Sequence, residues 1–292
     1  MNYRPKSNII YGDINLSHYD AFAFYCNVFD KPVRNVDVIQ IPGKDGDIIM
    51  DNGRYNNVER SYIIQIHGVE NAKALLGKLS STVGYKRLTD EYDPDIYFEA
   101  RLKSVPTIDR WVGEYVRAKV VFDRKPYKKY LSGDIPATIT GRTWNSRHTY
   151  YIVEYSLNNP GEIAFPVIEL TPLRNNDTAF TINYTWNGGS VVDIGHTHQS
   201  SNPDLVPKWS EESYTYVLDC EKGLFYNKNI STLMPTVIQN QGEQCFPYIR
   251  KGASTYRIYI SADIDSSGQV IDPVGDDAIV LEPVLYPRWR TL

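Results

Sequence analysis

The chain has 292 residues, of which 42% are hydrophobic and 23% are charged, a composition that excludes a largely disordered protein. Its length suggests two domains, because a domain commonly takes about 100 to 200 residues. The net charge is −4, with 31 basic and 35 acidic residues, and the sequence has no basic stripe of the kind that binds duplex DNA.

The first half of the sequence is typical of strands separated by turns. With 23 Tyr and only 3 Met, the composition favours β structure, because aromatic side chains suit a pleated surface. Several runs show the apolar alternation or β-branched enrichment of a strand. They cover residues 20–29, 33–41, 62–67, 84–88, 96–102 and 111–122.

One segment of the first half has helical spacing instead. Val69, Ala72, Leu76 and Leu79 recur three or four residues apart, with Gly68 before them. This spacing predicts a helix near residues 69–80. An antiparallel sheet or small barrel with one helix laid against it is therefore expected for the first domain.

Basic and turn-forming residues from Lys125 to Asp134 interrupt the aromatic strands, so we place the domain boundary just beyond them. This divides the chain into domains of residues 1–136 and 137–292. In the second domain short β-like runs recur with turn signals roughly every ten residues, which is typical of a β-sandwich. They cover residues 149–155, 166–170, 179–185, 214–218, 256–260 and 278–284.

The segment from Ile41 to Asn56, IPGKDGDIIMDNGRYN, concentrates glycine, aspartate and asparagine. A phosphate-binding loop needs Gly-x-x-x-x-Gly-Lys-Ser/Thr before a helix, whereas here the lysine precedes the second glycine and a strand-like run follows. Asp-Gly and Asn-Gly pairs are strong hairpin signals, so we predict paired turns at 45–46 and 52–53. The candidate turn or interface residues are Pro42, Gly43, Lys44, Asp45, Gly46, Asp47, Gly53 and Arg54, together with Lys125, Pro126 and Tyr127 of the junction.

No residue pattern indicates catalysis. The five histidines lie in no recognised catalytic or zinc signature, so no enzyme activity and no cofactor are expected. The run from Asp263 to Gly268 begins like a calcium loop, but Val274 stands where the closing glutamate belongs, and a hairpin tip explains the same residues. His196 and His198 have no third ligand nearby in sequence, which favours an exposed loop over a metal site.

Cysteine and tryptophan leave two smaller questions. Cys26, Cys220 and Cys245 are odd in number and without Cys-x-x-Cys spacing, so we expect small buried hydrophobes rather than disulfides or zinc ligands. Sugar rings stack on aromatic faces, which makes Trp186 and Trp209 candidate glycan contacts, although packing in a sandwich core explains such residues as well. A carbohydrate-binding host-adhesion protein, acting through the second domain, is therefore the alternative function.

The start of the sequence and its hydropathy bear on location. Residues 1–7 lack the apolar core of a signal peptide, and no apolar run approaches the roughly 20 residues that cross a bilayer. We expect synthesis in the cytoplasm and no membrane insertion.

Several short motifs follow one another along the chain. They are PGKDGD (42–47), NGRY (52–55), GYKRL (84–88), YDPDIY (92–97), VFDRKPY (121–127), YLSG (130–133), NP (159–160), FP (165–166), LDCEKGLFY (218–226), FP (246–247) and PRWR (287–290). Taken together, this ordered set resembles the distal tail protein family of long-tailed, non-contractile bacteriophages. No single motif is specific, but the set spans nearly the whole chain, with a weaker likeness in the second half. Lys44 departs from the pattern, because arginine is commoner there in the family.

The resemblance implies a ring-forming first domain, a split barrel or β-sandwich with one helix, and a galectin-like β-sandwich as the second domain. We also expect the last ~15 residues to dock back on the first domain. Such proteins form a hexameric ring that joins the tail tube protein to a tail-associated tip protein, and some hold receptor-binding proteins. The expected location is the tail tip of the virion. DNA would pass through the ring without specific binding, so we expect a lumen that is not basic.

Overall fold

The computed structural model describes residues 6–25, 31–145, 150–172, 181–186, 192–195, 215–228, 238–239, 248–261 and 281–292. The chain divides into two compact units. The first contains residues 1–131 with Thr291 and Leu292, and the second contains residues 132–290. The fold is mainly β and has one α-helix among the described residues, as the sequence predicts.

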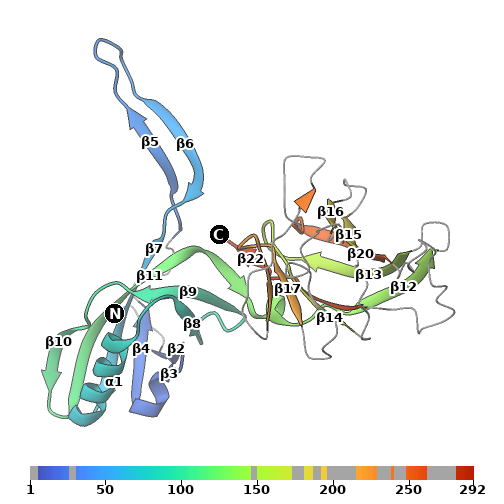
Figure 1. Cartoon of the computed structure of the whole chain (residues 1–292). Coiled ribbons are helices and arrows are strands. Elements are labelled where there is room, and N and C mark those ends of the chain that lie inside the picture. The colour runs from blue at the N-terminus through green and yellow to red at the C-terminus, as the bar shows by residue number, and fades with distance from the viewer. Residues whose placement is uncertain are drawn as a thin grey trace, which may run out of the picture. The chain divides into compact units, whose positions relative to one another are not determined.

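The first unit is built on one antiparallel sheet, in the order β1-β4-β7-β11-β9-β8-β2-β3 (Figure 1). Two further strands, β10 and β22, pair with β11 outside this path. The strands are β1 (Lys6–Ser7), β2 (Ile9–Tyr11), β3 (Ile14–Asn15), β4 (Ala21–Tyr25), β7 (Val58–His67), β8 (Lys86–Asp90), β9 (Ile96–Leu102), β10 (Thr107–Val112), β11 (Tyr115–Tyr130) and β22 (Arg290–Thr291), with a 3-10 turn at Leu16–Tyr19.

The core of the first unit lies between one face of this sheet and helix α1 (Val69–Ser81). Alternate residues of β11, such as Val116, Val120 and Phe122, are buried beside Ile64 and Ile66 of β7. The helix buries Ala72, Leu75 and Leu79, so its apolar face centres on Leu75, whereas the sequence pattern placed Leu76 there. Burial of one leucine side chain stabilises the fold by about 1.5 to 3 kcal/mol.

A two-stranded ribbon, β5 (Arg34–Ile39) and β6 (Ile48–Tyr55), projects from the first unit (Figure 1). It forms a sheet of its own, with Ile39 opposite Ile48 and Val38 opposite Ile49. We refer to residues 33–56 as the ribbon. Its side chains are almost all exposed, so the first unit's core contributes little to holding its outer part.

The second unit contains two antiparallel sheets. Tyr155 of one sheet donates a hydrogen bond to the Pro283 carbonyl of the other (2.7 Å), and buried Ile168 and Leu285 face the same interior. The first sheet comprises β12 (Ile139–Asn145), β13 (Tyr150–Asn159), β20 (Gly252–Ser261), β15 (Thr181–Trp186), β16 (Val192–Gly195) and β19 (Ile238–Gln239). The second comprises β18 (Leu224–Asn227), β17 (Tyr216–Asp219), β14 (Val167–Pro172) and β21 (Leu281–Tyr286), and a 3-10 turn covers Leu131–Asp134.

Three local predictions are wrong, each because an irregularity breaks a regular pattern. The run 111–122 is not one strand: Gly113 and Glu114 turn the chain between β10 and β11. Asn52-Gly53 is not a hairpin turn but part of an irregularity within β6, where residues 52–54 face only Asn35 of β5. Residues 125–127 do not end the strands; they form a bulge inside β11. Pro126 fits there because a bulged residue donates no ladder hydrogen bond.

Candidate assembly surfaces of the first unit

The ribbon exposes apolar side chains on both faces. Residues opposite each other in an antiparallel pair share a face, so Ile39 and Ile48 lie on one side and Val38 and Ile49 on the other. Ile49 is 67% exposed, and its neighbour Met50 is 56% exposed. A two-stranded hairpin is marginally stable in water by itself, so a surface that covers both faces is expected to stabilise the ribbon.

Six of the candidate residues, Pro42 to Asp47, form the tip of the ribbon. Gly43 and Gly46 both have φ of 82°, a left-handed conformation in which side chains other than glycine are strained. A Cβ atom at either position would meet no atom within 4 Å, so strain and not collision explains the need for glycine. The tip side chains are exposed, and the remaining two ribbon candidates, Gly53 and Arg54, lie in the irregular part of β6.

The base of the ribbon is braced by aromatic and ionic contacts. Arg34 lies 3.5 Å from the Asp51 carboxylate and 4.5 Å from the ring centre of Tyr55. The Tyr55 ring in turn meets Tyr127 edge to face, with ring centres 6.2 Å apart. Tyr127 therefore connects the bulge of β11 to the ribbon, so the structure brings together two groups of candidate residues that are far apart in sequence.

Amide side chains hold the same base. Asn35 donates to the Asn56 side-chain oxygen (2.7 Å) and accepts a hydrogen bond from Asn52 (2.8 Å). Asn57, just beyond the ribbon, donates to the Tyr85 hydroxyl (2.8 Å) and the Asp123 carboxylate (3.1 Å). The first two hydrogen bonds join the two strands of the ribbon to each other, and the Asn57 bonds tie the chain just beyond the ribbon to the rest of the first unit.

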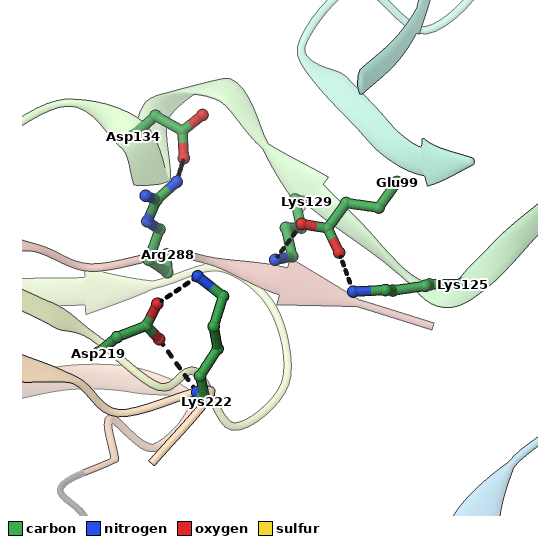
Figure 2. A network of polar contacts seen from close by, with 7 residues as sticks. All are labelled: Glu99, Lys125, Lys129, Asp134, Asp219, Lys222 and Arg288. Atoms are coloured by element: carbon green, nitrogen blue, oxygen red, sulfur yellow. Dashed lines mark hydrogen bonds and ion pairs between the residues drawn. The ribbon is translucent and has the colours of Figure 1, made fainter. Parts of the chain in front are cut away.

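Lys125, another candidate, belongs to an ion-pair group on β9 and β11 (Figure 2). Its ammonium lies 2.5 Å from one Glu99 oxygen, and Lys129 lies 3.1 Å from the other. Burial alone would raise the pKa of Glu99, but the hydrogen bonds and positive charges of the two lysines outweigh it. The pKa of Glu99 is therefore lowered from its ordinary value of 4.5.

This lowered pKa predicts an acid-sensitive contribution to stability. A carboxylate with a depressed folded-state pKa stabilises the fold above its unfolded pKa and loses that effect as pH falls through the folded value. We predict that Glu99→Gln lowers the urea midpoint at pH 7 and that this difference from the unsubstituted chain disappears as pH falls below the ordinary Glu range. Urea titrations at several pH values measure it, with exposed Glu70→Gln as the control. A Glu99→Gln difference that is equal at all pH values would contradict the prediction.

The β10–β11 hairpin is a second exposed surface, which the sequence does not predict because the run 111–122 is typical of one continuous strand. Trp111 is 57% exposed and Val112 is 58% exposed.

His67 anchors the turn: its ring nitrogens lie 2.9 Å from Asp20 and 3.0 Å from Glu114. Hydrogen bonds to Asp20 and then Glu114 raise the pKa of His67, so the contribution of this clamp is complete below the ordinary histidine pKa and is lost as pH rises through the raised pKa. The sequence does contain one signal for the turn between β10 and β11, because Gly113 interrupts the apolar run.

The remaining predictions concern tryptophan, cysteine and possible metal-binding residues. Trp186 ends β15, but its side chain is not described. Cys220 is buried, as expected, and burial raises the pKa of its thiol. Within the described ranges, no three His, Cys, Asp or Glu side chains are grouped as a metal would require, and no helix is long and apolar enough to cross a membrane. The predictions that lie outside the described residues concern Cys26, Cys245, Trp209, His196, His198 and the run 263–268.

No protein-family model matches the sequence, and no curated protein matches it. The solved structures similar to the chain include components of phage tails. One is the Dit (gp 19.1) protein of phage SPP1, described as a paradigm of the hub adsorption apparatus in phages that infect Gram-positive bacteria. It is 10% identical with a TM-score of 0.49, and the match covers 87% of this chain and 98% of that one.

A second is the phage P2 baseplate in its activated conformation with calcium, at 10% identity and a TM-score of 0.45 over 88% of this chain and 97% of the matched chain. An α-L-fucosidase from Vibrio sp. strain EJY3 reaches a TM-score of only 0.21 at 11% identity, over 86% of this chain and 42% of that one.

Proposed function

We propose that the chain is a structural hub of a phage tail, in which copies of the first unit close into a hexameric ring at the tail tip. The observation that carries the proposal is the ribbon, whose two faces expose Val38, Ile39, Ile48 and Ile49. The ordered motifs of the sequence supply the class of assembly. The hub acts by geometry, as a rigid connector, and not by catalysis.

A ring of identical subunits needs two different complementary patches on each copy. The ribbon supplies one such patch, and the strand edges and hairpins of the first unit supply others. In this proposal the ribbon lies against a neighbouring copy, which covers its apolar faces. Burial of apolar area at about 25 cal/mol per Å² then contributes to closing the ring.

The remaining surfaces of the hub would contact the tail tube protein on one side and the tip protein on the other. The second unit would lie at the periphery, as an attachment platform for receptor-binding proteins. DNA would pass through the ring without being bound, which is consistent with a net charge of −4. Some exposed basic groups of the first unit are paired with acids, as in Arg101 with Asp123 (2.9 Å) and Arg117 with Asp109 (3.2 Å).

The ribbon can be tested by two substitutions on opposite faces. Ile48→Asp with Ile49→Asp places a charge on each face, and neither side chain belongs to the core cluster of the first unit. We expect the double variant to keep its folded circular-dichroism spectrum and its thermal midpoint but to lose rings in mass photometry. Val83→Asp, at an exposed apolar residue after α1, is the matched control. Rings formed equally by both variants would overturn the role of the ribbon.

The tip of the ribbon gives a related prediction. Valine at Gly43 and Gly46 would be held at positive φ, at a cost on the order of 1 to 3 kcal/mol for each residue. We predict that Gly43→Val with Gly46→Val reduces ring formation, while Gly43→Asn with Gly46→Asn retains most of it, because Asn tolerates the left-handed region. Mass photometry over a concentration series measures both. Full ring formation by the valine variant would show that the tip conformation is dispensable.

A further inference from the structure

The β10–β11 hairpin (residues 107–119) has the properties of the patch that the ribbon requires. Ile108 lies opposite Ala118, and Trp111 lies opposite Val116. Because Ala118 and Val116 are buried, Ile108 and Trp111 lie on the core-facing side of the sheet, yet both are exposed. Trp111 donates its indole N–H to the Gly113 carbonyl of its own turn (2.8 Å). Its polar atom is thus satisfied while most of the ring surface stays exposed.

The outer edge of β10 is open to a further strand. In the part of the chain that the structure describes, β10 pairs with β11 alone. An edge strand offers unpaired N–H and C=O groups that bind another extended segment. All six residues of β10 are exposed, which leaves this edge accessible.

The charges of the hairpin favour an acidic partner. Arg110 lies directly opposite Arg117, and like charges in that position repel each other. Arg117 is paired with Asp109 (3.2 Å), whereas Arg110 and Lys119 have no ion-pair partner among the described residues. Residues 107–119 contain three basic and two acidic side chains, a net charge of +1.

The outer part of the ribbon has the opposite charge. Residues 37–51 contain four aspartates and one lysine, which gives −3. Of these aspartates, Asp51 is paired with Arg34, so Asp37, Asp45 and Asp47 remain to complement a basic surface. Apolar side chains lie between these acids along β5 and β6, as they do between the basic residues of β10 and β11.

We propose that the ribbon of one copy adds along the outer edge of β10 of the next copy, with Asp45 and Asp47 near Arg110 and Lys119 on one face of the hairpin and with Ile48 near Trp111 on the other face. The two hairpins extend from the sheet in opposite directions (Figure 1), so a ribbon does not reach the hairpin of its own chain. The contact therefore joins different copies head to tail. This inference rests on the proposed ring and names the acceptor surface within it.

A charge exchange tests the contact. Arg110→Glu with Lys119→Glu places like charges opposite the ribbon, and Asp45→Lys with Asp47→Lys does the same from the other side. We expect each pair to raise the concentration at which rings form by at least about tenfold, and the four substitutions together to recover most of this loss. The exposed Lys73→Glu variant of α1, which also reverses a positive charge, is the control and should leave rings unchanged. Purely additive losses would overturn the proposal.

Cysteine cross-linking provides a readout that does not depend on charge. Ile48→Cys with Trp111→Cys should give covalent oligomers under oxidation, while Ile48→Cys with the exposed Val83→Cys should give far fewer. If the unsubstituted chain forms rings but neither cross-links nor charge rescue appear, the acceptor surface is wrong and the ring proposal stands. If the chain forms neither rings nor cross-links at high concentration, both proposals fail.

Discussion

Replacing Asp90 by alanine is expected to destabilise the first unit by about 3 to 5 kcal/mol, because it leaves the charge of Arg60 buried without this carboxylate. Both side chains are buried, and they form an ion pair of 3.1 Å. Asp90 also accepts hydrogen bonds from Ser7, from the Tyr62 hydroxyl (3.0 Å) and from the Tyr92 amide (3.0 Å). The substitution thus removes the acceptor shared by β1, β7 and the turn after β8.

Urea denaturation followed by circular dichroism measures this loss, and hydrogen exchange assigns it to the first unit. The adjacent acid, Glu91, is exposed and serves as the control, so Glu91→Ala should cost far less. Arg60→Met combined with Asp90→Ala should recover part of the stability, because the buried charge is then absent as well. A loss of less than about 1 kcal/mol in the Asp90→Ala variant would show that the network is not important for stability.

A second large effect is expected from Gly133→Ala in the second unit. A Cβ atom there would collide with the backbone nitrogen of Trp289 and lie 3.0 Å from the carbonyl carbon of Arg288. The approach is fixed by a hydrogen bond from the Arg288 amide to the Gly133 carbonyl (2.8 Å) and by the Arg288–Asp134 ion pair of 2.5 Å (Figure 2). Trp289 is buried, so the backbone cannot shift without disturbing the core.

Overpacking of this kind typically costs about 1 to 3 kcal/mol, and we expect Gly133→Ala to lie at the upper end because backbone atoms are in the way. Gly141→Ala is the matched control, since the nearest atom there is the end of the Glu154 side chain at 3.1 Å. Thermal melts of the two variants measure the difference. Equal melting temperatures would contradict the packing that the structure shows around Gly133.

The sequence predicts the regular elements of the first unit well, because the apolar alternation of β7 and β11 directly records which side of the sheet is buried. The helix was also predictable, since Ala72 and Leu79 recur at helical spacing. Irregular positions were not predictable, because Gly113, Gly53 and Pro126 interrupt patterns that continue on both sides of them. Whether such a residue turns the chain or forms a bulge within a strand depends on which strand lies opposite.

The candidate assembly surfaces show the same limit. Alternation along β5 resembles that of a core strand, yet Val38 and Ile39 are both exposed because no second layer covers the ribbon in one copy. The contact between Tyr55 and Tyr127 joins segments that are distant in sequence, and only the folded sheet brings them together. The tip glycines have the positive φ that favours glycine in a turn, whereas their role at an interface stays a prediction.

Closure of several copies of this chain into a ring is tested most directly by the mass of the full chain in solution. Light scattering combined with negative-stain images, over a range of protein concentrations, gives both the number of copies and their arrangement. We predict a closed ring of six copies at high concentration, lost in the Ile48→Asp with Ile49→Asp variant. A chain that stays monomeric at all concentrations, with no rings in the images, would contradict the proposed hub.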